Sequence, residues 1–166
     1  MRILGIDPGF AIVGYGVVDY ESANFKTVDY GKITTHAGEK FPDRLNTVYM
    51  GVRQIIEAYS PEVLAIEELF FNTNTTTAIN VAQARGVIML AAKQANLKIY
   101  EYTPLQIKQA VAGYGRADKN QVQQMVKMFL KLKAVPKPDD TADALAVAIC
   151  HGNSSGLTGK LGDINV

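Results

Sequence analysis

The sequence predicts an α/β protein built on one mixed sheet of five strands that is flanked by helices. Three observations predict this fold class. Segments rich in Val, Ile, Tyr and Thr open the chain at 2–7, 12–20 and 25–34, as strands do. Two short apolar segments, 63–67 and 98–102, then alternate with helical patterns, which is typical of parallel strands joined by crossover helices. The length of 166 residues fits one domain with a sizeable core.

The remaining elements follow in order along the chain. The second and third strand segments are joined through a turn at 21–24, so we expect them to pair antiparallel. Residues 41–60 have apolar side chains at helical spacing, and Pro61 ends that pattern. Further helices are expected at 76–95, 104–113, 119–132 and 139–151. Residues 152–166 are rich in Gly and Ser without periodicity, so we expect a single domain at 1–151 and a flexible C-terminal tail.

The composition is that of an ordinary globular protein, with 48% apolar and 20% charged residues. The single cysteine, Cys150, cannot form an internal disulfide, which favours a reducing, cytoplasmic location. No signal-peptide pattern is visible, and the longest uncharged apolar stretch in the middle of the chain, at 86–92, is too short to span a bilayer. A secreted or membrane protein is therefore not expected.

The small net charge of +1 conceals a basic middle segment. Residues 85–137 carry ten Lys or Arg side chains and two acids, whereas residues 1–84 and 138–166 are both acidic on balance. This asymmetry predicts a polyanion bound on one face. The alternative is a set of solvated, lysine-rich helices, and the charge pattern alone does not decide between the two.

Two strand segments end on an acid. The segments ILGID and VLAIE close on Asp7 and Glu67, and the chain turns immediately after Asp7 through Pro8 and Gly9. Because parallel neighbours present their carboxyl ends at one edge of a sheet, we expect these two carboxylates side by side. They would repel each other unless they share a proton or a cation, so Asp7 is a candidate metal ligand. The alternatives are a turn-capping role for Asp7 and a solvated strand end at Glu67.

A third group of acids opens the last predicted helix, in DDTADALAVA at 139–148. Asp140 and Asp143 are three residues apart, so both project from one side of the first turn. We expect Asp139 to be the N-cap. Capping and the helix dipole could explain two of these acids, but they do not explain Asp143 in an Ala-rich helix packed on the core.

Four carboxylates from two strands and a helix could bind two Mg²⁺ ions roughly 3.5–4 Å apart, as in two-metal nucleases. Mg²⁺ prefers oxygen ligands, which suits a site made of carboxylates. The substrate would then be a phosphodiester, and the basic segment would bind its backbone. Within that segment, Lys108, Arg116 and Lys119 flank the glycines of VAGYGRADK, where the protein backbone could approach phosphate.

Five segments together resemble the RuvC family of bacterial Holliday-junction endonucleases: GIDPG at 5–9, AIEELFF at 65–71, QARGV at 83–87, the stretch 101–126, and DDTADALAVA. They occur in order and at consistent spacing within residues 1–151. The resemblance implies an RNase H-like nuclease domain there and favours Asp140 over Asp139 as the ligand. The catalytic metal ligands that it implies are Asp7, Glu67, Asp140 and Asp143.

The resemblance also implies a substrate, a cofactor and partners. The substrate is a four-way DNA junction, nicked symmetrically in recombination and repair, with two Mg²⁺ ions per site and Mn²⁺ as a substitute. The family's base-contacting aromatic residue falls on Phe70, with Phe71 as the alternative, and its DNA-contacting lysines fall on Lys108 and Lys119. RuvC-like proteins are homodimers that act with the RuvA–RuvB branch-migration complex. The helix at 76–95, apolar nearly all round, is our candidate for much of the dimer interface.

Two alternatives remain at this stage. A non-catalytic junction-binding protein of the same fold would not need all four acids. An actin-like or sugar-kinase-type phosphotransferase also begins with a strand–Asp–Gly turn, but it needs a second nucleotide-clamping domain for which 166 residues leave no room. His151, two turns beyond Asp143, is expected to cap the end of the last helix rather than to act in catalysis.

Overall fold

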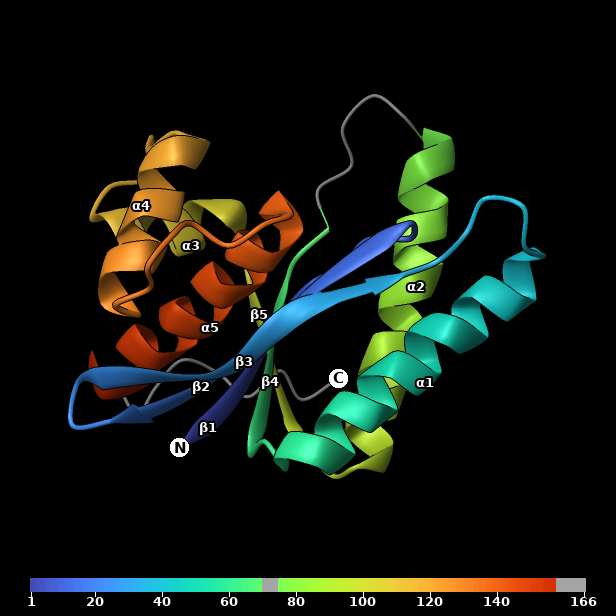
Figure 1. The fold of residues 1–166 in the computed structure, drawn as a ribbon, viewed down its shortest axis with the longest axis horizontal. Coiled ribbons are helices and arrows are strands. Elements are labelled where there is room, and N and C mark those ends of the chain that lie inside the picture. The colour runs from blue at the N-terminus through green and yellow to red at the C-terminus, as the bar shows by residue number, and fades with distance from the viewer. Residues whose placement is uncertain (70–74, 158–166) are drawn as a thin grey trace.

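The computed structural model describes residues 1–69 and 75–157, and these form the expected mixed sheet of five strands (Figure 1). The spatial order is β3-β2-β1-β4-β5. β1 pairs antiparallel with β2 and parallel with β4, and β4 pairs parallel with β5. The predicted fold class is therefore confirmed. The strands are β1 (Arg2–Asp7), β2 (Ile12–Glu21), β3 (Asn24–Thr34), β4 (Val63–Glu67) and β5 (Lys98–Tyr102).

Helices cover both faces of the sheet (Figure 1). One face packs against α1 (Phe41–Tyr59) and α2 (Thr75–Gln94), and the other against α3 (Pro104–Ala112), α4 (Lys119–Phe129) and α5 (Asp139–Leu157). Each face has its own buried cluster, and β1 contributes to both because its side chains alternate: Leu4 and Ile6 on one side, Ile3 on the other. Burial on both faces explains why β1 and β4 are apolar up to their terminal acids.

The last helix is longer than the sequence predicts. The prediction of a flexible tail from residue 152 is wrong for residues 152–157, which continue α5. Gly152 is buried against the ring of Phe25, and the Asn153 side chain donates a hydrogen bond to the carbonyl oxygen of Ala110 at 3.0 Å. These tertiary contacts offset the low helix propensity of Gly and Asn. The rest of the predicted tail lies outside the described residues.

The other helices begin and end close to their predicted bounds. The largest difference is at α4, which ends at Phe129 because Lys131 adopts a left-handed φ of 51°. The turn closes when the Leu132 amide donates to the carbonyl of Lys127 at 2.9 Å. Among residues 1–69 and 75–157, none of the helices combines the length and the hydropathy of a membrane span.

The first turns of α5 lie directly on the β1–β2 hairpin. A Cβ atom at Gly14 would come within 2.0 Å of the backbone oxygen of Asp140, and one at Gly5 within 2.2 Å of that of Ala144. Glycine allows this backbone-to-backbone approach because it has no Cβ. Since Gly14 is also the register partner of Asp7, the contact brings the start of α5 to the carboxyl end of β1.

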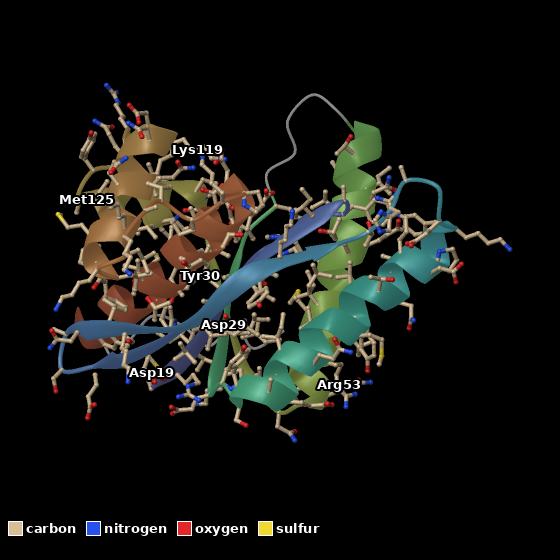
Figure 2. All side chains as sticks on the ribbon, in the orientation of Figure 1. Asp19, Asp29, Tyr30, Arg53, Lys119 and Met125 are labelled. Carbon is tan, nitrogen blue, oxygen red and sulfur yellow. The ribbon has the colours of Figure 1, made fainter. Side chains whose placement is uncertain are left out.

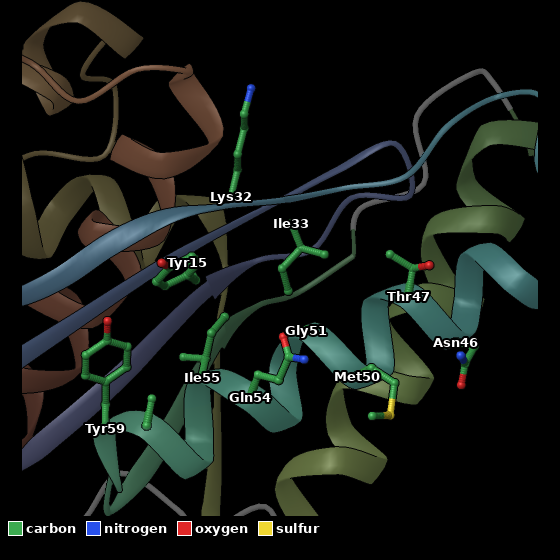
Figure 3. Close-up of a pocket in the computed structure, with 11 residues that line it drawn as sticks. Tyr15, Lys32, Ile33, Asn46, Thr47, Met50, Gly51, Gln54, Ile55 and Tyr59 are labelled. Carbon is green, nitrogen blue, oxygen red and sulfur yellow. The ribbon is translucent and has the colours of Figure 1, made fainter.

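A groove of about 610 Å³ lies between α1 and the β2–β3 hairpin (Figure 3). Tyr15 and Ile33 line it from the strands, and Gln54 and Tyr59 line it from α1. The hydroxyl groups of Tyr15 and Tyr59 both donate to Oδ2 of Asp29, at 2.9 and 2.6 Å. None of the expected site residues within 1–69 and 75–157 lines this groove, so it is separate from the acids.

Candidate active site

The carboxyl ends of β1 and β4 bring Asp7 and Glu67 together. Ile6 and Ile66 are register partners in these parallel strands, so the acids that follow them stand side by side at one edge of the sheet. Burial raises the pKa of Glu67, and hydrogen bonding to the Asp7 carboxyl group opposes this rise. A hydrogen bond between two carboxyl groups requires that one of them carries a proton.

Asp7 is the group that holds this proton. Burial raises the pKa of Asp7 to about 8, with further contributions from the negative charges of Glu67, Asp143 and Asp140. Burial also raises the pKa of Glu67 and of Asp143. At neutral pH Asp7 is therefore mostly protonated, and the four acids form one electrostatic cluster.

Asp140 and Asp143 enter this cluster from the first turns of α5. The β1–β2 hairpin brings the two acids close to Asp7. Gly14 of this hairpin is the register partner of Asp7, and it also packs against the backbone of Asp140. The positive end of the helix dipole favours carboxylates at this position. The four acids expected from the sequence are thus brought together from two strands and one helix.

Asp139 differs from its neighbours in α5. The prediction that it is the N-cap is wrong, because α5 begins at Asp139 itself. Its carboxylate accepts a 2.8 Å hydrogen bond from Lys137 and lies 3.5 Å from the Nζ atom of Lys119. Hydrogen bonds from Lys137 and Gln123 lower the pKa of Asp139. Asp139 therefore pairs with two lysines and does not cap the helix.

Lys119, which is labelled in Figure 2, supplies positive charge to the cluster. It is the first residue of α4, and a capping box between Asp118 and Gln121 fixes the start of that helix. Its Nζ atom lies 3.0 Å from Oδ2 of Asp143. Burial lowers the pKa of Lys119, but hydrogen bonds and negative charge from Asp143 and Asp139 outweigh this effect and leave the pKa raised. Lys119 is therefore fully charged at neutral pH.

A cavity of about 250 Å³ opens beside the acids. Its charged lining consists of Glu67, Lys108, Lys119 and Asp143, and its apolar lining of Pro104, Ile107, Val122 and Ala146. Lys108 reaches the cavity because a capping box between Thr103 and Gln106 starts α3 directly after β5. Two ammonium groups next to two carboxylates suit a phosphate that would be held beside the acids.

The residues expected to bind DNA have different positions. Lys108 and Lys119 line the cavity, whereas Arg116 is exposed in the loop between α3 and α4 and does not line it. Phe70 and its alternative Phe71 lie outside the described residues. The structure therefore gives a position for three of the four candidates and brings two of them to the acids.

His151 is a core residue behind β5. We expected His151 to cap the end of α5, but this prediction is wrong because the helix continues to Leu157. Its Nδ1 atom shares a 2.7 Å hydrogen bond with the hydroxyl of Tyr102, and its ring packs at 4.4 Å on that of Tyr100. Burial lowers the pKa of His151 to about 4, so the imidazole is neutral at pH 7.

The donor atoms of the cluster suit a hard divalent cation, because carboxylate oxygens are the ligands that Mg²⁺ prefers. Within residues 1–69 and 75–157, no three Asp, Glu, His or Cys side chains converge as a ready-made metal cage. Like charges repel, and Asp143 is paired with Lys119 at 3.0 Å, so the carboxylates need a shared positive partner to come closer together. A divalent cation would take over from the Asp7 proton and from Lys119 as the positive partner. By donor chemistry, the residues present fit such an ion.

One ion pair near the cluster was not foreseen from the sequence. Arg85 of α2 pairs with Glu101 of β5, and the two side chains are only 15% and 16% exposed. The Nε atom of Arg85 also donates to the backbone oxygen of Glu67 at 3.4 Å. The sequence does mark Arg85 as unusual, since it is the only charged residue between 76 and 92, but nothing in the sequence identifies Glu101 as its partner.

The strand order, together with acids at the ends of β1 and β4 and at the start of α5, defines a protein of the RNase H-like class. The yeast mitochondrial Holliday junction resolvase shares the fold at 15% identity, with a TM-score of 0.70 over 93% of this chain and 79% of that chain. Residues 3–151 match the family model described as crossover junction endodeoxyribonuclease RuvC. The chain belongs to the RuvC family.

Relatives with this name match over nearly the whole chain. The crossover junction endodeoxyribonuclease RuvC of Clostridioides difficile is 59% identical over 164 residues, covering 99% of this chain and 97% of its own length. That of Caldanaerobacter subterraneus subsp. tengcongensis is 57% identical over 162 residues, or 98% of both chains. The RuvC structure of Thermus thermophilus is 35% identical, with a TM-score of 0.88 over 94% of this chain and 96% of that chain. The same protein in complex with a Holliday junction substrate gives 0.89 at 35% identity, over 93% and 94%. The resemblance seen in the sequence is confirmed.

Proposed function

We propose that this protein resolves Holliday junctions as a metal-dependent endonuclease that makes symmetric nicks in four-way DNA. The observation that carries the proposal is the electrostatic cluster of four acids, Asp7, Glu67, Asp140 and Asp143, where β1, β4 and α5 meet. Family membership supports the substrate class, because relatives are named crossover junction endodeoxyribonuclease and one related structure holds a Holliday junction.

The four acids are the proposed catalytic metal ligands, for two Mg²⁺ ions per site with DNA bound and with Mn²⁺ as a substitute. When bound, the ions supply an activated water and stabilise charge on the leaving 3′ oxygen. The protein holds the carboxylates at one point of the sheet edge. Asp7 must release its proton to act as a ligand, and its raised pKa makes metal binding stronger as the pH rises toward 8.

Lys108 and Lys119 are the proposed phosphate-binding residues, since both line the cavity next to Glu67 and Asp143. Arg116 extends this basic surface along the exposed α3–α4 loop. Contacts of this kind position the DNA backbone and carry no sequence information. Phe70 is the proposed residue that contacts bases at the junction, where an apolar wedge repays the cost of unstacking through contacts to bent DNA.

A homodimer is proposed because symmetric nicking needs two matched sites. α2 has an exposed stripe that suits a partner helix and consists of Ile79, Gln83, Gly86 and Leu90. Their spacings of four, three and four residues are those found where two helices pack side by side. Ile79 and Leu90 are 57% and 50% exposed. In the part of the chain that the structure describes, no neighbouring group lies within 4 Å of the place that a Cβ atom would take at Gly86, so another helix could approach closely there.

The proposed setting is the cytoplasm, where the RuvA–RuvB branch-migration complex would be the partner. The buried free thiol of Cys150 suits a reducing compartment. The alternative function is a non-catalytic junction-binding protein, and it differs from the proposal in one measurable property, namely cleavage.

The decisive experiment compares a labelled four-way junction with a linear duplex of the same sequence, in Mg²⁺ and in EDTA. We expect paired symmetric nicks in the junction alone, abolished by EDTA and by Asp7→Asn, with junction binding retained. Tight binding without cleavage under any divalent metal would favour the non-catalytic protein. Equal cleavage of both DNAs would remove junction selectivity from the proposal.

The dimer has its own test. Leu90→Glu places a charge in the exposed stripe of α2 and should give a monomer in sedimentation velocity. Met128→Glu is the matched control, because Met128 is an exposed apolar residue of α4, 65% accessible, outside the stripe. If both variants sediment like the wild type, the stripe is not the interface.

A further inference from the structure

Arg85 joins three elements at the sheet edge where Glu67 lies. Its guanidinium group pairs with the carboxylate of Glu101 on β5, and its Nε atom donates to the backbone oxygen of Glu67 on β4 at 3.4 Å. β4 and β5 are paired at this point, since Ile66 is the register partner of Glu101 and Glu67 that of Tyr102. One side chain from α2 therefore ties the last residue of β4 to β5.

The backbone is held on the other side of Glu67 as well. The amide of Glu68 donates to the carbonyl oxygen of Tyr102 at 2.9 Å, continuing the strand pairing by one bond. Without Arg85, nothing described here would tie the Glu67 carbonyl to α2. The direction of the Glu67 side chain depends on this short segment of backbone, because a carboxylate at a strand end turns with the peptide that carries it.

Stability alone is a weak reason for this ion pair. Both side chains are largely removed from water, at 15% and 16% exposure, and the desolvation of two charges is costly. Replacing a buried ion pair by apolar residues of similar volume is often neutral or even stabilising. The pair can instead fix the positions of the groups that it contacts, because the planar, rigid guanidinium group holds a carboxylate and a carbonyl oxygen in set directions.

We infer that Arg85, held in place by Glu101, is a positioning residue that fixes the Glu67 carboxylate within the acid cluster. The inference rests on the proposed function, since it takes Glu67 as a metal ligand. Arg85 acts only through the backbone of Glu67 and through the pairing of β4 with β5. Its loss lets the end of β4 move, so the cluster holds divalent ions less well while the fold and the DNA-binding lysines remain.

The test uses the full chain with three variants. Arg85→Met combined with Glu101→Leu removes both charges and keeps apolar volume, so no buried charge is left unpaired. Arg85→Lys keeps the charge but not the fork. Arg53→Met is the matched control, because Arg53 forms an exposed ion pair with Glu57 on α1, and Figure 2 shows Arg53 well away from Lys119, the partner of Asp143.

Three properties are measured: junction affinity in EDTA, single-turnover cleavage of the junction at varied Mg²⁺, and the rise in melting temperature on adding Mg²⁺. We expect the double variant to bind the junction like the wild type but to cleave it roughly 10- to 100-fold more slowly, the usual effect of removing an outer-shell support of a metal ligand. Its half-saturating Mg²⁺ concentration should rise and its Mg²⁺-induced gain in melting temperature should shrink. Arg85→Lys should lie in between, and Arg53→Met should match the wild type.

A double variant that cleaves at the wild-type rate with an unchanged Mg²⁺ requirement overturns the inference. It is also overturned if the double variant and Arg85→Lys both fail to fold, because the pair would then be a structural requirement rather than a positioning device. The proposed function fails in a different way, namely when the wild-type protein cuts no junction with any divalent metal.

Discussion

The Nζ atom of Lys119 lies 3.0 Å from Oδ2 of Asp143, so a lysine at the start of α4 neutralises an acid near the start of α5. The same ammonium group lies 3.5 Å from Asp139 and opposes the rise in the pKa of Asp7. Without DNA, one cation thus balances several acids. A divalent ion would take Asp143 from Lys119 and leave the ammonium group to bind phosphate.

Replacing Lys119 by Met should slow cleavage more than it weakens binding. Loss of one preorganised charge beside the reacting phosphate is expected to cost about 100-fold in single-turnover rate. The slope of log affinity against log salt should fall by about 1, because one phosphate contact is lost. Lys133→Met, an exposed lysine of the same basic segment, is the control and should keep the wild-type rate. An unchanged rate for Lys119→Met would contradict its role at the phosphate.

Asp7→Asn should stabilise the metal-free protein, and more so at higher pH. The pKa of Asp7 is about 8 in the folded chain and near 3.8 when unfolded, so between these values the folded state binds more protons and wild-type stability falls as pH rises. The free energy of unfolding of the variant therefore exceeds that of the wild type by an amount that grows from about pH 4 to 8. Each kcal/mol of this difference raises the melting temperature by ~2–4 °C for a domain of this size. Saturating Mg²⁺ should reverse the order at pH 8, because only the wild type keeps all four carboxylates. Scanning calorimetry across this pH range, with and without Mg²⁺, measures both effects.

Gly14→Ala should impair cleavage by displacing the start of α5. The new Cβ atom would meet the Asp140 backbone oxygen at 2.0 Å, a contact that only movement of the helix or the hairpin can relieve. Overpacking of this kind costs about 1–3 kcal/mol and here also moves Asp140 relative to Asp7. Gly38→Ala is the control, since no atom of the described residues lies within 4 Å of its added Cβ. Chemical denaturation and cleavage assays on both variants decide the matter, and equal behaviour of the two would refute the argument.

His151→Gln should weaken the fold without changing the pH profile of cleavage. The substitution disturbs the hydrogen bond to Tyr102, at an expected cost of about 1–3 kcal/mol for the buried hydroxyl. The pKa of His151 is about 4 in the folded chain against 6.5 unfolded, so wild-type stability falls as pH drops through this window, and the variant loses this dependence. Urea denaturation at pH 4.5 and 7 shows the difference. A shifted pH–rate profile would instead give His151 a part in catalysis.

The central sheet could be predicted from the sequence because its signals are local. β1 and β4 are short apolar runs that end on acids, and parallel pairing of two such runs places Asp7 and Glu67 together by geometry alone. The acids of α5 were found in the same way, from their spacing at the start of a helical pattern. Knowledge of a family was needed to choose Asp140 over Asp139, because spacing treats the two alike.

Contacts between distant segments could not be predicted. The extension of α5 depends on Gly152 packing against Phe25 and on the hydrogen bond of Asn153 to Ala110, and local propensity argues against a helix there. The pairing of Arg85 with Glu101 likewise joins a helix to a strand, and no periodicity in either segment identifies the partner. Such long-range contacts are set by the completed fold.

The contact between Gly14 and the Asp140 backbone has a consequence for synthesis of the protein. Asp7 leaves the ribosome well before Asp140 and Asp143, which belong to the last described helix, so translation at ~5–20 residues per second separates the acids in time. A growing chain without α5 lacks half of the carboxylates and the helix that packs on its hairpin. A nascent or prematurely terminated chain that lacks α5 therefore has no complete acid set, so the proposed nuclease activity would arise only once this helix is in place.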